Sequence, residues 1–320
     1  MLLPSNIGAA QPGEPACVAY GGAMTARNDA DDIPSLSHGL EPVAGTGPTL
    51  AGRTLIMSGG SRGIGLAIAL RAARDGANVA ILAKTGEQHP KLEGTVYTAA
   101  EQIEAAGGHA LPLVGDVRND DDVRAAVDAS VRTFGGIDIV VNNASAIDLS
   151  KTPDVDMKRY DLMADINVRG TFMLSKFALD ALRRSTNPHI LTLSPPLNLA
   201  PKWAGMHLAY TMAKYGMSLT TLGLAEELKD DGVAVNSLWP ATLIDTAAIR
   251  NMPGGQRMVQ AARNPEIVAD AAHAILVRGS RTCTGHFFTD EEVLREEGVT
   301  DLTGYSLGAP EDQLVPDIFL

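Results

Sequence analysis

Short apolar runs alternate with longer segments of helical spacing over most of the chain. Strands are expected at residues 54–57, 79–82, 110–114, 137–141, 190–193 and 233–238. Helices are expected between them, at residues 64–74, 98–106, 123–134, 159–184 and 208–228. The strand segments lack polar alternation, which is typical of strands buried on both faces of a parallel sheet. The pattern predicts an α/β fold with a doubly wound parallel sheet (a Rossmann fold), as a single domain over residues 50–320.

Two segments break this alternation. Residues 1–50 contain seven Gly and six Pro and show no sustained periodicity, so we expect residues 1–49 to form a flexible N-terminal tail. Residues 241–263 carry a Pro-Gly-Gly turn and several methionines, and we expect a mobile loop or lid there rather than a second domain.

Composition and charge narrow the function classes. The 320 residues include 26 Lys+Arg against 38 Asp+Glu, a formal net charge of −12, which argues against nucleic acid or an anionic membrane as a partner. The two cysteines, Cys17 and Cys283, exclude a disulfide framework and a Cys-rich zinc site, and no metal is expected. We see no apolar stretch long enough for a membrane span, no secretory signal and no peroxisomal signal, so we expect a cytoplasmic protein.

A glycine-rich turn follows the first expected strand and opens the first expected helix. Gly63 and Gly65 would let the backbone approach a pyrophosphate, which would then lie at the helix N-terminus. An ordinary Gly-rich turn is the alternative, but the position between strand and helix favours dinucleotide binding. The residues expected to bind the cofactor here are Ser58, Gly59, Ser61, Arg62, Gly63, Ile64 and Gly65.

Charges near the second expected strand bear on which dinucleotide binds. NAD-dependent folds usually place an acid at the end of that strand, where it binds the ribose diol. Here the strand ends at Lys84, no acid occurs before Glu87, and Arg62 stands in the glycine turn. Two cations without an acid favour a 2′-phosphate and hence NADP(H), although both could be ordinary surface charges and NAD(H) stays possible.

Tyr210 and Lys214 are four residues apart and therefore lie on one face of an expected helix. A free phenol is a poor base at neutral pH, and a nearby ammonium group lowers its pKa. The alternative is a surface pair of small energetic value. Ser194 ends the preceding strand, where it could hold a carbonyl or alcohol oxygen beside Tyr210 or could simply be a turn serine ahead of two prolines.

Two asparagines complete the candidate chemistry. Asn143, in the run Asn142-Asn143-Ala144-Ser145, follows the fourth expected strand at the ligand edge of the sheet. Asn167 lies inside the expected helix 159–184, where asparagine is a poor helix former and could bind water or bend the helix.

In this order and spacing, these motifs resemble the short-chain dehydrogenase/reductase family over residues 50–290. The resemblance implies that Tyr210 gives or takes the proton, that Lys214 lowers its pKa and binds the nicotinamide ribose, and that Ser194 positions the substrate oxygen. It also implies a proton-relay water at Asn167. Further cofactor contacts implied by the resemblance are Asp116, Val117, Asn143, Ala144, Pro240 and Thr246.

The run from Ser194 to Leu199, with Thr284-Gly285-His286-Phe287, is similar to the hydroxysteroid dehydrogenase-like protein 2 subgroup of that family. We therefore expect an NADP(H)-dependent oxidoreductase that interconverts an alcohol and its carbonyl. One alternative is an NAD-dependent isoprenoid-alcohol dehydrogenase. Another is a dinucleotide-binding regulatory protein without turnover, favoured by the long interval between Ser194 and Tyr210. The resemblance also implies a homodimer or homotetramer formed through helices 159–184 and 208–228.

Apolar residues flank the expected nicotinamide edge of the sheet in two segments. They form either a pocket wall for an elongated, lipid-like substrate or ordinary core and oligomer contacts. The residues concerned are Leu197, Leu199, Trp203, Met206, Leu243, Ile249, Met252 and Met258.

Overall fold

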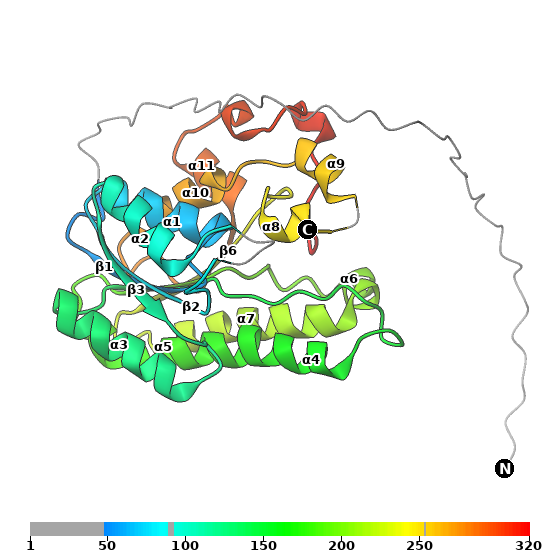
Figure 1. Ribbon diagram of the computed structural model, residues 1–320. Coiled ribbons are helices and arrows are strands. Elements are labelled where there is room, and N and C mark those ends of the chain that lie inside the picture. The colour runs from blue at the N-terminus through cyan, green and yellow to red at the C-terminus, as the bar shows by residue number, and fades with distance from the viewer. Residues whose placement is uncertain (1–47, 89–92, 253) are drawn as a thin grey trace, which may run out of the picture. The chain divides into compact units, whose positions relative to one another are not determined.

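The fold is built on seven parallel strands whose central members are fully buried. The computed structural model describes residues 48–88, 93–252 and 254–320 (Figure 1). The strands pair in the order β3-β2-β1-β4-β5-β6-β7, and every pairing is parallel. This arrangement confirms the predicted doubly wound sheet. The strands are β1 (Thr54–Ser58), β2 (Asn78–Ala83), β3 (His109–Val114), β4 (Ile139–Asn142), β5 (His189–Thr192), β6 (Ala234–Trp239) and β7 (Phe287–Thr289).

Helices cover both faces of this sheet (Figure 1). On one face lie α1 (Gly63–Arg74), α2 (Val96–Ala105), α10 (Glu266–Leu276) and α11 (Asp290–Glu296). On the other lie α3 (Asp120–Phe134), α4 (Met157–Met163), α5 (Thr171–Leu182) and α7 (Leu208–Glu227). The buried apolar residues accordingly form a separate cluster on each side of the sheet, because parallel strands present aliphatic side chains to both layers. Shorter helices are α6 (Pro201–Met206), α8 (Ala247–Arg250) and α9 (Gly255–Gln260), with 3₁₀ turns at Thr303–Tyr305 and Glu311–Gln313.

The expected helix 159–184 is not continuous. A π-helical turn, Ala164–Gly170, separates α4 from α5. Asn167, in that turn, is fully buried, and its carboxamide donates to the Ala146 carbonyl at 3.0 Å and accepts from the Ala146 N–H at 2.8 Å. The asparagine therefore ties the helix to the segment after β4, and π turns of this kind are frequent at functional sites.

The boundaries of the other predicted elements are close to those observed, but β7, α10 and α11 were not predicted. The segment 241–263 carries the short helices α8 and α9, and Thr246 caps α8 through the Ile249 N–H at 3.4 Å. The predicted tail lies outside the described residues except for residues 48 and 49, and so does Cys17. No helix among the residues described is long and apolar enough to cross a membrane.

His189 at the start of β5 gives a test of the core. Its Nε2 lies 3.1 Å from the carbonyl oxygen of Arg278, while Nδ1 is buried without a partner, and burial lowers the pKa of the ring to about 4. The unfolded chain protonates a histidine near pH 6.5, so falling pH favours unfolding between about pH 6.5 and 4. By pH 5 this single group should lower the free energy of unfolding by about 2 kcal/mol.

We expect His189→Gln to remove that part of the pH dependence, measured by urea unfolding at pH 7.5 and pH 5. His109→Gln is the matched control, because the His109 side chain is exposed. If His189→Gln and the wild-type protein lose the same stability on acidification, this interpretation of His189 is wrong.

Candidate active site

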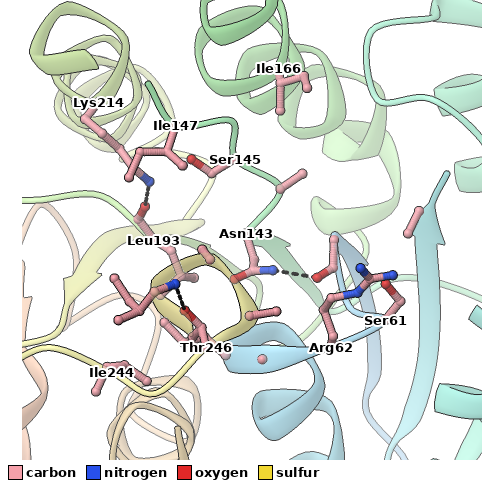
Figure 2. A pocket seen from close by; sticks show the side chains of 18 of the residues that line it. Ser61, Arg62, Asn143, Ser145, Ile147, Ile166, Leu193, Lys214, Ile244 and Thr246 are labelled. Carbon is pink, nitrogen blue, oxygen red and sulfur yellow. Dashed lines mark hydrogen bonds between the residues drawn. The ribbon is translucent and has the colours of Figure 1, made fainter. Parts of the chain in front are cut away.

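A cavity of about 530 Å³ opens at the carboxyl edge of the sheet (Figure 2). It is lined by the β1–α1 turn, by the ends of β2, β4 and β6, and by residues of α7, the 241–263 segment and the C-terminal segment. Its size is typical of small-molecule and cofactor sites. Sixteen residues were predicted as cofactor contacts, and those that line the cavity are Gly59, Ser61, Arg62, Gly63, Ile64, Lys84, Asp116, Val117, Asn143, Ala144, Tyr210, Lys214, Pro240 and Thr246.

The glycine turn forms one wall of the cavity at the start of α1. Gly63 adopts a positive φ of 56°, and a Cβ atom on Gly65 would lie 2.6 Å from the Gly59 carbonyl oxygen, so both positions require glycine. Asn143 stabilises the turn by donating to the same Gly59 oxygen at 2.7 Å (Figure 2). Ser58 supports it from behind through a hydrogen bond from the Ala144 N–H to its hydroxyl at 3.2 Å. The close backbone and the uncapped N-terminus of α1 fit a pyrophosphate.

Two cationic side chains, Arg62 in this turn and Lys84 after β2, line the cavity. Arg62 donates to the Gly94 carbonyl oxygen at 2.8 Å, and its side chain lines the cavity. Its buried Nε has no hydrogen-bond partner among the described residues. Lys84 follows β2 and lies 3.3 Å from the Asp116 carboxylate, whose pKa Arg118 and Lys84 together lower to about 2. Asp116 is therefore ionised at neutral pH and forms an ion pair with Lys84. Of the two cations that were predicted to bind the 2′-phosphate, Arg62 is thus the one whose charge is less neutralised by a neighbouring acid.

Tyr210 and Lys214 lie on one face of α7 and line the opposite end of the cavity, as predicted. The Lys214 ammonium donates to the Leu193 carbonyl oxygen at 2.8 Å (Figure 2) and lies 5.0 Å from the centre of the Trp239 ring. Both side chains are buried, with 5% of Tyr210 and 3% of Lys214 exposed. The surface-pair alternative for these two residues is therefore wrong.

Burial sets the protonation of this pair. It lowers the pKa of Lys214 to about 7, and the negative charge of Asp317 acts in the opposite direction. Burial raises the pKa of Tyr210 well above its usual range, the Asp317 charge raises it further, and a hydrogen bond with Ser145 lowers it. At neutral pH the phenol is protonated and can donate a proton, while Lys214 lies close to its titration point.

Ser194 and Asn167, the other two predicted catalytic residues, do not line the cavity. The Ser194 hydroxyl is fully buried, 2.9 Å from the Ser237 hydroxyl, which itself bonds Thr221 at 2.9 Å. Both Asn167 carboxamide groups bond the Ala146 backbone rather than standing free for a water. The Ser194 hydroxyl is therefore engaged with the Ser237 side chain and does not face the cavity lining.

Other residues reach the cavity without having been predicted as site residues. Ser145 lay in a motif noted at the end of β4, but Asp317 and Ile318 near the C-terminus gave no signal in the sequence. Of the apolar residues expected as a substrate wall, Leu243, Ile249, Met252 and Met258 line the cavity. The remaining four do not, namely Leu197, Leu199, Trp203 and Met206. Two of the sixteen predicted cofactor contacts, Ser58 and Gly65, are also not among the residues that line the cavity.

The described part of the chain holds no cluster of three or more His, Cys, Asp or Glu residues that could bind a metal ion. The polar groups of the cavity are instead hydroxyls, amides and single charges, which suit an organic cofactor and substrate.

Comparison with known proteins agrees with this geometry. The family model for the short chain dehydrogenase matches residues 53–254. Hydroxysteroid dehydrogenase-like protein 2 from Xenopus laevis is 55% identical over 85% of this chain, and the Homo sapiens protein is 52% identical over the same share. These matches confirm the family and subgroup inferred from the motifs. The chain spans 64% of the length of these relatives.

Solved structures give the same result. A short chain dehydrogenase from Mycobacterium thermoresistibile is 54% identical with a TM-score of 0.81, covering 85% of this chain and 96% of that one. A short-chain dehydrogenase/reductase from Serratia marcescens is 26% identical with a TM-score of 0.65, covering 75% of this chain and 96% of that one.

Proposed function

The chain belongs to the short-chain dehydrogenase family of oxidoreductases, and we propose that it is an NADP(H)-dependent enzyme interconverting an alcohol and its carbonyl on an apolar, lipid-like substrate. The observation that carries this proposal is the juxtaposition of Tyr210 and Lys214 with the glycine turn around one cavity. The cavity, the glycine cradle and the free α1 N-terminus fit a dinucleotide. When bound, the nicotinamide supplies or accepts the hydride.

Within this proposal, Tyr210 is the acid that protonates the substrate oxygen during carbonyl reduction and takes the proton back in the reverse direction. Because burial raises the pKa of Tyr210, the phenol is protonated at neutral pH, which suits the reductive direction. In its protonated form, Lys214 places a cation in the same cavity and would stabilise the phenolate that forms after proton transfer. Ser145 lines the cavity and hydrogen-bonds with Tyr210, so we assign it the substrate-orienting role and regard Ser194 as a positioning residue.

The preference for NADP(H) gives the first test of this proposal. Arg62→Ala should weaken NADPH binding by about tenfold to a hundredfold and NADH binding much less, because the lost charge-assisted hydrogen bonds go to the 2′-phosphate alone. Lys84→Ala should have a smaller effect, since Asp116 already compensates that charge. Binding would be followed by fluorescence titration, with exposed Arg132→Ala on α3 as the control. Equal losses for both cofactors would refute the assignment and favour the NAD-dependent alternative.

The acid/base role gives the second test. Tyr210→Phe keeps the ring but removes the proton, so kcat should fall by about 10²–10⁴-fold while NADPH still binds. Lys214→Ala should impair both turnover and cofactor binding, because its ammonium also lines the cavity. Tyr97→Phe is the matched control, since Tyr97 is exposed on α2. Near-normal turnover in Tyr210→Phe would contradict the mechanism.

The apolar lining of the substrate side gives the third test. Leu243, Ile249, Met252 and Met258 wall this end of the cavity, and the name shared by the relatives points to steroid-like substrates. In a homologous series of ketones, kcat/KM should rise with chain length. Each buried methylene should lower the activation free energy by up to about 0.8 kcal/mol. Met258→Ser should flatten the climb, and exposed Met157→Ser should leave it unchanged. A preference for short polar carbonyls would overturn the lipid-like assignment.

The position of Ser194 favours one rival function, a dinucleotide-binding regulatory protein without turnover. This alternative predicts tight NADPH binding with no oxidation or reduction across a broad carbonyl and alcohol panel. The Ser145 assignment predicts turnover on such a panel. The Ser145 hydroxyl beside Tyr210 can orient the substrate oxygen, which is the role that Ser194 was expected to fill.

A homodimer or homotetramer also belongs to this proposal. Large apolar side chains remain exposed on the helices that were expected to form the interface, and they are Phe172 on α5 and Leu208, Met212, Leu219 and Leu222 on α7. Exposed large apolar side chains on these two helices support association between copies. A cytoplasmic location stays a prediction of the sequence.

A further inference from the structure

The C-terminal residues 315–319 are bound to the substrate side of the cavity by backbone hydrogen bonds. The Leu243 N–H donates to the Val315 carbonyl at 2.9 Å, and the Asp317 N–H donates to the Ala241 carbonyl at 3.1 Å. The Trp239 indole N–H donates to the Ile318 carbonyl at 3.0 Å. The segment therefore runs alongside residues 239–243, which are the last residue of β6 and the four residues after it.

Phe319 anchors this segment inside an aromatic cluster. Only 2% of its surface is exposed, and its ring centre lies 6.2 Å from that of Tyr210, with the two planes inclined by 28°. Among the described residues it is the one non-glycine residue with a positive φ, 80°. Backbone strain of this kind persists only where surrounding contacts impose it. The other rings around it belong to Trp203, Tyr215 and Trp239.

Asp317 lines the cavity together with Tyr210, Lys214 and Ser145. Its Oδ1 accepts from the Ile318 N–H at 2.6 Å, and no ion pair forms with it in the described part of the chain. Its charge acts on both Tyr210 and Lys214, and Asp290 is the other acid close enough to affect it. Burial raises the pKa of Asp317 to about 7, so the group is mostly ionised above pH 8.

This segment lies outside the part of the chain that matches the family model, which ends at residue 254. We propose that Asp317 and Ile318, held in place by the segment 315–319, form a substrate-facing part of the active-site wall and that Asp317 is a specificity-determining residue. Its carboxylate repels an anionic group next to the reacting carbon and accepts a hydrogen bond from a neutral donor there, such as an amide or hydroxyl. The substrate class is therefore an apolar carbonyl or alcohol with an uncharged hydrogen-bond donor beside the reacting centre. This inference rests on the proposed function.

The test uses a 2-oxo acid and its amide, two substrates of nearly equal shape that differ in charge. Both carry the apolar chain that the wild-type protein turns over best in the ketone series, and kcat/KM is measured with NADPH at pH 8.5. The wild-type protein should prefer the amide by about tenfold or more, because the carboxylate of the 2-oxo acid would be brought next to the like charge of Asp317. In Asp317→Asn that preference should fall by about tenfold, mainly through a gain on the acid.

Asp312→Asn is the matched control, because it makes the same chemical change at an exposed residue five positions away. Thermal unfolding and NADPH binding check that each variant is folded, and Asp317→Ser carries the same expectation if the asparagine variant is unstable. An amide preference that is unchanged in Asp317→Asn, or lost equally in Asp312→Asn, would overturn the inference while leaving the proposed function intact. An absence of wild-type turnover on the whole ketone series would instead refute the proposed function and this inference with it.

Discussion

The parallel pairing of β1 with both β2 and β4 determines where the chemistry of this protein lies. Since the strand order reverses at β1, the connections on either side of it run to opposite faces of the sheet and leave a crevice at its carboxyl edge. The glycine turn after β1 and Asn143 after β4 face each other across that crevice and are joined by a hydrogen bond of 2.7 Å. The place of the cavity at the carboxyl edge of the sheet follows from this pairing.

Burial of charge within that crevice is the second constraint. An ammonium group removed from water is destabilised unless it is hydrogen-bonded, and the protein meets this cost for Lys214 with the Leu193 carbonyl and the face of Trp239. Burial lowers the pKa of Lys214 to about 7 and keeps Tyr210 protonated at neutral pH. Small electrostatic changes near this pair therefore change the fraction of Lys214 that is charged. Asp317 is the nearby acid whose negative charge acts on both groups.

The sequence carried enough information for the sheet and for the Tyr210–Lys214 pair, because apolar runs and i,i+4 spacing are local signals. The sequence carried less information about the break between α4 and α5. Asn167, in the π-helical turn, hydrogen-bonds with Ala146, which is 21 positions away and so is not visible in a local pattern. Ser194 was expected beside Tyr210, yet its hydroxyl bonds Ser237 on β6. No local pattern specifies which neighbour a strand-end hydroxyl will choose, because that depends on strand pairing.

The substrate end depends on still longer-range contacts. The segment 239–243 and the segment 315–319 are more than 70 residues apart, yet they hydrogen-bond to each other along the cavity wall. The proposed cofactor contacts Gly59, Lys84 and Asn143 lie within the part that matches the family model, whereas Asp317 and Ile318, which line the same cavity, lie beyond it. If the proposed roles hold, dinucleotide binding and substrate choice are encoded in different parts of the chain, and substitutions in the C-terminal segment would alter selectivity while the glycine turn and the Tyr–Lys pair stay intact.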